Sequence, residues 1–332
     1  MNEYTFGNTN SDCWEWEYGL LGPLKRVRPF DCYLWSISPM IVKLRNEFKD
    51  DDFDGWSPST FLPLGYWDVL LEELLNRSPT MEEISALAAL GAWSFTKGRY
   101  KFDQVVYEEI IRGGFSGVLP QEELEHLPDW CVYIDTPKFE LYEGLRIHGF
   151  WVFLDEVIDS GTKVLNLILN SVLGPIQIFF DLDGSDMEIS LRRTVEKCHD
   201  KVDLRSTDYS AWDEGDTRNL VSNAGKLMAL VLFLCSEDRD IKERRGNELF
   251  PCFTANRRIK WAKSMSPARK IRKFIVGHEL GEVLRSVKFT ENSELGECNI
   301  VSVAPGHWYQ ADSETGRKSN YKWKPPKFNN SK

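Results

Sequence analysis

Residues 130–182 decide the fold, and they read WCVYIDTPKFELYEGLRIHGFWVFLDEVIDSGTKVLNLILNSVLGPIQIFFDL. The stretch holds four short runs rich in Val, Ile, Phe and Tyr, and Gly, Pro and Asp separate these runs. Such runs are typical of β-strands. Because short connections join them, we expect an antiparallel meander. The runs cover residues 130–135, 147–154, 163–169 and 175–182.

The chain before this stretch has the pattern of helices, because apolar residues recur there at helical spacing. For the third helix, Ser78 is the expected cap, Pro79 the first helical residue, and Glu82 lies in the acidic first turn. The fourth helix is expected to stop at Gly113-Gly114. The four expected helices cover residues 39–49, 66–75, 78–95 and 103–111.

The chain after the meander is expected to return to helices and to end in a hairpin. Residues 216–235 give the strongest helix, with Asp216 as its cap and a buried apolar second half. Residues 268–287 are predicted to form another helix. Alternating residues around Trp308 and Trp323 predict a C-terminal β-hairpin. The predicted fold class is therefore α+β: a helical N-terminal part, a central mostly antiparallel sheet, further helices and the hairpin.

Charge divides the chain into unequal parts. The whole chain of 332 residues carries a net charge of −10. Residues 1–253 hold 25 basic and 44 acidic side chains, a balance of −19, whereas residues 254–332 hold 16 and 7, a balance of +9. We expect three segments: an irregular aromatic-rich segment with the first helix (1–60), an acidic α+β body (61–253), and a basic region with a helix and the hairpin (254–332).

Apolar runs and cysteines indicate a cytoplasmic protein with no membrane partner. The longest apolar run, residues 227–235, is about half of what a bilayer-spanning helix needs. The first residues lack the basic and apolar regions of a secretory signal. Seven Cys occur without a CxxC pair, which favours reduced thiols over a disulfide framework or a zinc site. We expect no metal and no other cofactor.

Two strings suggest chemistry without completing a motif. The run that ends in Asp181-Leu182-Asp183-Gly184 resembles the first motif of Mg²⁺-dependent phosphohydrolases, and its alternative is a hairpin turn. His278-Glu279 resembles the start of a zinc-protease helix, but position 282 is Glu where the second His is needed. Because no catalytic motif is complete, we expect a protein that is not an enzyme, with a phosphohydrolase as an alternative.

A basic cluster supports another alternative, an RNA-binding protein that acts through its C-terminal region. Cations with an aromatic side chain among them suit single-stranded nucleic acid. A solvated surface that complements the acidic body is the competing interpretation. The cluster comprises Arg257, Arg258, Lys260, Trp261, Lys263, Arg269, Lys270, Arg272 and Lys273.

Several strings, in order and at similar spacing over residues 85–332, resemble a known family. They are Gly91-Ala92-Trp93 with Thr96, Gly98 and Tyr100; Leu127 to Asp135 (LPDWCVYID); Gly149-Phe150-Trp151; Gly306-His307-Trp308; and Lys322-Trp323-Lys324-Pro325 with Phe328 to Ser331 (FNNS). Together they resemble the second class of type V-A anti-CRISPR proteins.

The resemblance implies a function in translation. Members of that family act against the type V-A CRISPR effector, an RNA-guided nuclease. They recognise the N-terminal peptide of the effector as it is made and lower the level of its mRNA. The resemblance therefore implies that the partner is this peptide or another nascent chain, with the ribosome or mRNA as a further partner.

Two sets of residues are candidates for these contacts. An extended peptide needs backbone groups of a strand edge and apolar pockets for its side chains. We expect aromatic residues of the first two strands to line such pockets, because large rigid rings give contact area at low entropic cost. In the tail, four residues are candidates for contact with ribosome or RNA. The peptide-binding candidates are Trp130, Tyr133, Phe150 and Trp151, and the tail candidates are His307, Trp308, Lys322 and Trp323.

Overall fold

A computed structural model gives the fold over most of the chain. It describes residues 39–44, 57, 59–141, 145–171, 174–193, 214–236, 239–251, 267–293, 302–304, 307–311, 320–324 and 327–329. Residues 39–44 are helical, as expected for the start of the first helix. None of the described helices is long and apolar enough to cross a bilayer.

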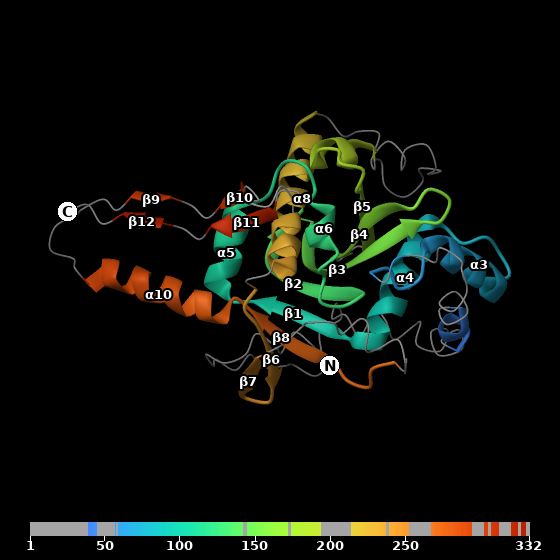
Figure 1. Cartoon of the computed structure of the whole chain (residues 1–332), viewed down its shortest axis with the longest axis horizontal. Coiled ribbons are helices and arrows are strands. Elements are labelled where there is room, and N and C mark those ends of the chain that lie inside the picture. Colours follow the sequence, from blue (N-terminus) through green and yellow to red (C-terminus); the bar gives the residue numbers. More distant parts are fainter. Residues whose placement is uncertain are drawn as a thin grey trace, which may run out of the picture.

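The helices surround a central sheet (Figure 1). Helices and strands are interspersed along the chain. Of the helices named here, all but α6 were predicted at least in part. The helices are α3 (Leu64–Leu75), α4 (Met81–Thr96), α5 (Gln104–Gly113), α6 (Gln121–Leu124), α8 (Glu214–Cys235) and α10 (His278–Ser293).

One large sheet has the strand order β5-β4-β3-β2-β1-β8-β6-β7, and two short pairs, β10-β11 and β9-β12, lie near the C-terminus. The strands are β1 (Gly98–Phe102), β2 (Cys131–Glu140), β3 (Arg146–Val157), β4 (Thr162–Ser171), β5 (Gly174–Asp181), β6 (Ile241–Arg245), β7 (Glu248–Pro251), β8 (Arg272–Val276), β9 (Ser302–Ala304), β10 (His307–Ala311), β11 (Asn320–Lys324) and β12 (Lys327–Asn329).

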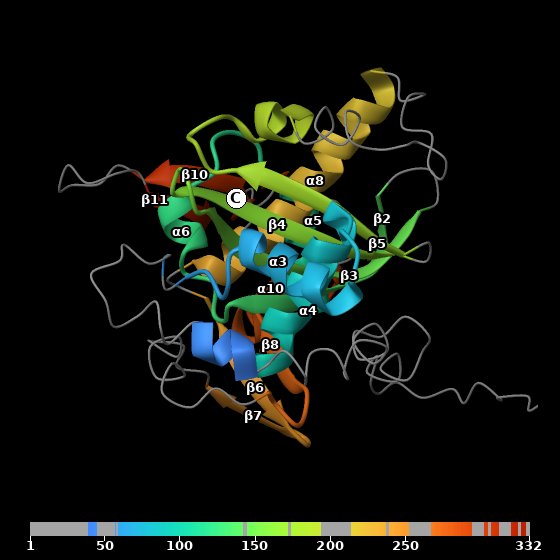
Figure 2. The same cartoon turned by 90° about the vertical axis from the view of Figure 1, so that its right-hand side faces the viewer.

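The predicted meander is confirmed, since β2, β3, β4 and β5 pair antiparallel in sequence order. In β2, β3 and β4 alternate side chains enter two different cores, whereas β5, at the edge of the sheet, contributes buried residues to one core only. The core on one face is closed by α8, α5 and α6, and the core on the other face by α3 and α4. Figure 2 shows α3 and α4 lying across β3, β4 and β5. The α+β fold class is thus confirmed.

The helix predicted over residues 268–287 is wrong in its first half. Residues 272–276 form β8, which pairs parallel with β1 and antiparallel with β6. Gly277, with φ of +73°, separates β8 from α10, which begins at His278. The wrong prediction followed Ile271 and Ile275, which are four residues apart as on one helical face. The buried residues of the strand, Phe274 and Val276, are two apart, as strand alternation requires.

Two predicted helix caps are also wrong. The cap of α4 is Thr80, whose side chain accepts a hydrogen bond from the backbone of Glu83, and Glu83 binds the Thr80 N–H in return. This capping box places the start of the helix two residues after Pro79. Helix α8 begins at Glu214, so Asp216 lies inside its first turn. Asp103, the first residue of the fourth predicted helix, is the cap of α5, and the predicted stop at Gly113-Gly114 is confirmed.

The proposed division at residue 253 stays a prediction. Strand β8, from the basic C-terminal region, lies between β1 and β6, both of which come from the acidic body. Within the described residues, the two regions therefore share one sheet.

Candidate functional site

The aromatic residues predicted to bind a peptide form a layer between the sheet and α4. The ring of Trp93, on α4, lies 6.4 Å from both Tyr133 and Trp151, centroid to centroid. Tyr133 and Trp151 are opposite each other on β2 and β3, with centroids 4.8 Å apart. Trp130 contacts Phe61 at 5.3 Å. Three of the four candidates thus belong to one cluster, and sequence reasoning did not place Trp93 among them.

The fourth candidate, Phe150, lies on the other face of the sheet. It is adjacent to Trp151 in a strand, so its side chain points to the α8 core, where Val152 and Leu154 also lie. Strand alternation, read strictly, would have separated it from the other three.

All four candidates are buried, with at most 2 % of each residue exposed. In this arrangement Trp130, Tyr133 and Trp151 pack in the core below α4, Phe150 packs in the core below α8, and none of the four reaches a ligand on the surface. Their role in peptide binding stays a prediction, and for the three below α4 it requires α4 to move away from the sheet.

Gly149 allows the close packing of this layer. A Cβ at this position would lie 2.5 Å from the Tyr133 ring and 2.6 Å from the Ile134 carbonyl oxygen. The Tyr133 hydroxyl, held over the glycine, accepts a hydrogen bond from Asn170 Nδ2 at 3.1 Å. Close packing therefore explains why the Gly149-Phe150-Trp151 string begins with glycine.

A buried ion pair joins β1 to β2 at the edge of the same layer. Arg99 Nε lies 2.9 and 3.1 Å from the two carboxylate oxygens of Asp135, and both residues are buried. Next to it, the Tyr100 hydroxyl donates to Asp129 at 3.0 Å, and the Tyr100 ring stacks on Phe274 of β8. These contacts connect the meander to the parallel strands.

The C-terminal hairpin is confirmed, with Trp308 directly opposite Trp323 in the β10–β11 pair. Both indoles pack against the core, and Trp323 meets Phe233 of α8 edge-on at 5.5 Å. Figure 1 shows β10 and β11 beside α5 and α8. The two Trp side chains therefore anchor the hairpin. The side chains of His307 and Lys322 lie outside the described part of the chain, and a contact of the tail with RNA stays a prediction.

The DxDG string forms a tight turn after β5. The Asp183 carboxylate accepts the Ser185 N–H at 2.9 Å and binds Arg193 at 2.6 Å. The Ser185 side chain, its backbone N–H and Arg193, in that order, hold the pKa of Asp183 down at about 2. Gly184 takes a positive φ of +83°. The string leads into the helical residues 187–193 and not into a second strand, so the hairpin interpretation is wrong. Asp183 is engaged in the turn itself.

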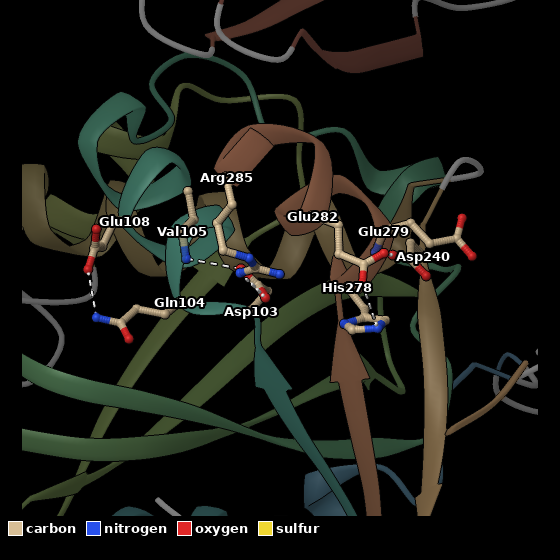
Figure 3. Close-up of polar contacts among 9 residues, drawn as sticks. All are labelled: Asp103, Gln104, Val105, Glu108, Asp240, His278, Glu279, Glu282 and Arg285. Carbon is tan, nitrogen blue, oxygen red and sulfur yellow. Dashed lines mark hydrogen bonds and ion pairs between the residues drawn. The ribbon is translucent and has the colours of Figure 1, made fainter. Parts of the chain in front are cut away.

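The His278 string lies where the parallel strands β1 and β8 end and two helices begin (Figure 3). Asp103 caps α5 through the Val105 N–H and binds Arg285 of α10 at 2.8 Å. Asp240 accepts the Glu279 N–H at the start of α10, and His278 Nε2 lies 3.7 Å from Glu282. In the part of the chain that the structure describes, no three His, Cys, Asp or Glu side chains gather as metal ligands.

Part of the basic cluster serves the fold. Arg272 binds Glu243 of β6 at 3.0 Å and lies over the Phe274 ring. Arg269 and Lys270 are exposed. Residues 257–263 lie outside the described residues.

Comparison with known proteins identifies the family of this chain. A model of the AcrVA2-like family, described as the anti-CRISPR type V subtype A2 family, matches residues 100–320, which is more than half of the chain. The chain belongs to this family. It is thus an anti-CRISPR protein of the type V-A class, as the resemblance of its sequence strings implied.

A solved structure supports the same fold. The chain matches a structure described as "Crystal structure of AcrVA2", with a TM-score of 0.58 and 20 % sequence identity. The match covers 93 % of this chain and 97 % of that chain. No curated protein matches the sequence. At this identity the likeness concerns the fold, including α3 and α4, which precede the part that the family model matches.

Asp155, at the end of β3, fixes α3 on the sheet. Its carboxylate accepts the N–H of Leu64, the first residue of α3, at 2.9 Å. Burial raises the pKa of Asp155 to about 6, from an ordinary value of 3.8, although this hydrogen bond lowers it. A carboxyl group at a helix start is usually stabilised as the anion, but here desolvation outweighs that effect.

This pKa predicts that Asp155→Asn increases the free energy of unfolding, and that the increase depends on pH. The unfolded chain releases the proton near pH 4 and the folded chain near pH 6. Between these values the folded state holds more protons, so the free energy of unfolding falls as pH rises. Asn cannot ionise and keeps an oxygen for Leu64. The stability of the variant relative to wild type should rise by up to about 3 kcal/mol from pH 4 to pH 7. Urea unfolding at both pH values measures this, and an equal difference at the two values contradicts it.

Proposed function

We propose that this chain blocks production of the type V-A CRISPR effector nuclease by binding its nascent N-terminal peptide. Binding during translation causes loss of the effector mRNA. Membership in the AcrVA2-like family carries this proposal. The acidic side chains near the two motif-like strings have structural roles, which suits a binding protein. Asp183 accepts a hydrogen bond within a turn, and Asp103 and Asp240 accept backbone hydrogen bonds at the starts of α5 and α10.

The proposed inhibitor acts without chemistry of its own, and a cellular nuclease degrades the message. A protein that recognises a nascent chain needs only binding contacts with the peptide, and these form once the peptide has left the ribosome. Residues 1–253, with a charge of −19, favour a peptide that carries cations.

The test separates the peptide from the mRNA that encodes it. The full-length protein is co-expressed with an effector whose first codons are altered in two ways. Synonymous recoding changes the nucleotides and keeps the peptide. A compensated frameshift keeps most nucleotides and changes the peptide. We expect the effector mRNA to fall with the recoded gene and to stay constant with the frameshifted gene, as measured by quantitative PCR.

A binding assay accompanies this experiment. Immobilised protein should retain a synthetic peptide of the effector N-terminus and release a scrambled peptide of the same composition. If the mRNA follows the nucleotide sequence and not the peptide, or if no effector peptide is retained, the proposed function is wrong.

A further inference from the structure

An exposed apolar patch lies where α3 meets the turn between β3 and β4. It consists of Gly65 and Val69 of α3, Val157 at the end of β3, and Ile158 of the turn. Val69 is 63 % exposed, Ile158 54 % and Val157 43 %. Ile158 Cδ1 lies 3.6 Å from the place where a Cβ of Gly65 would be, so helix and turn are in contact. The patch is therefore continuous across two elements.

Acidic side chains surround this apolar patch. On α3, Gly65, Asp68, Val69 and Glu72 are spaced by three and four residues, so they share one face of the helix, and all are exposed. Asp159 follows Ile158 and is also exposed. We call Asp68, Glu72 and Asp159 the acidic rim. Neither α3 nor residues 155–161 contain Lys or Arg.

The fold holds this surface in place. Trp67, Leu70 and Leu71, on the opposite face of α3, are buried in the core below α4. Asp155 binds the Leu64 N–H and Glu156 binds the Ser57 N–H, at 2.9 and 2.8 Å. The Gly161 N–H donates to the Val157 carbonyl at 2.8 Å and closes the turn. The patch is thus presented by ordered backbone, which lowers the entropic cost of binding.

We propose that the apolar patch and its acidic rim are the docking site of the nascent effector peptide, a segment with an exposed apolar side chain beside cations. This inference rests on the proposed function and locates its site. Exposed aliphatic side chains gathered within a charged rim mark interaction surfaces, whereas single ones are ordinary. Three aliphatic side chains beside Asp68, Glu72 and Asp159 fit an apolar and basic segment by charge complementarity.

The location differs from the buried aromatic layer, where the sequence placed the peptide-binding candidates. The patch needs no movement of α4, because its side chains are already exposed. The aromatic layer then acts as the support on which α3 and α4 rest.

The chain offers matched controls for a test. Val283, on α10, is 58 % exposed and Ile189 is 49 % exposed, so they resemble Val69 and Ile158 in type and exposure. The patch variant is Val69→Ser with Ile158→Ser, and the control variant is Val283→Ser with Ile189→Ser. Because all four side chains are exposed, we expect both variants to fold, which circular dichroism and urea unfolding check.

The measurement is the affinity of each full-length variant for the synthetic effector N-terminal peptide, by fluorescence anisotropy. We expect the patch variant to bind at least about tenfold more weakly than wild type, and the control variant to stay within about twofold. A rim variant, Asp68→Asn with Glu72→Gln, should bind more weakly at low salt and lose part of the salt dependence of wild type.

The outcomes separate the site from the function. If wild type binds the peptide and the patch and control variants bind it equally well, the docking site is wrong and the proposed function stands. If wild type binds no effector peptide, both are wrong. A loss in the patch and rim variants, with the control unchanged, supports both.

Discussion

Replacing Arg99 by Met should lower the free energy of unfolding by about 3–5 kcal/mol, because it leaves the Asp135 carboxylate buried without its cation. Asp135 would then have to ionise in the core or take up a proton. Domains are stable by only about 5–15 kcal/mol, so this variant should express poorly at 37 °C. Urea unfolding of the purified protein measures the loss.

Two further variants identify the cause of this loss. Arg99→Met combined with Asp135→Leu should recover part of the stability, since removing both charges leaves no unpaired ion in the core. Arg77→Met breaks an exposed pair with Glu83 and should leave the midpoint of unfolding nearly unchanged. If Arg99→Met behaves like Arg77→Met, the buried pair does not stabilise the junction of β1 and β2.

The second large effect is expected from Trp93→Ala. This residue is fully buried, its ring contacts Tyr133 and Trp151, and its Nε1 donates to the Gly98 carbonyl at 2.8 Å. The substitution opens a cavity between α4 and the sheet and frees a backbone carbonyl. Large-to-small changes of this kind cost about 3–5 kcal/mol.

Trp93→Phe separates the two contributions in this prediction. It keeps most of the ring contacts and loses the hydrogen bond to Gly98, so its loss of stability should lie between wild type and Trp93→Ala. Thermal unfolding followed by circular dichroism measures both variants. An equal loss in the Phe and Ala variants would show that the hydrogen bond, and not the packing, dominates.

The sequence predicts the meander well because each of its strands contains a run rich in Val, Ile, Phe and Tyr, and Gly, Pro and Asp separate these runs. It misses the parallel part of the sheet for a physical reason. Strands β1, GRYKF, and β8, RKFIV, each contain two cations and have only five residues. Their partners lie far away along the chain, so no local pattern reveals the pairing.

The candidate site was located only in part for a related reason. The strings with Trp130, Tyr133 and Trp151 do mark one cluster, but composition cannot distinguish a buried aromatic layer from a surface pocket. For Val69, helical spacing places the side chain on the exposed face of α3 with Asp68 and Glu72. Only the fold shows that Ile158, from the β3–β4 turn, lies against this helix.

The place of β8 in the sheet has a consequence for the life of the protein itself. Gly98 pairs with Arg272, 174 positions later, so the middle of the sheet cannot close until most of the chain has left the ribosome. Contacts that are so distant in sequence make folding slow and leave strand edges open meanwhile. A protein proposed to intercept another chain early in its synthesis therefore completes its own sheet only after residue 276 has been translated.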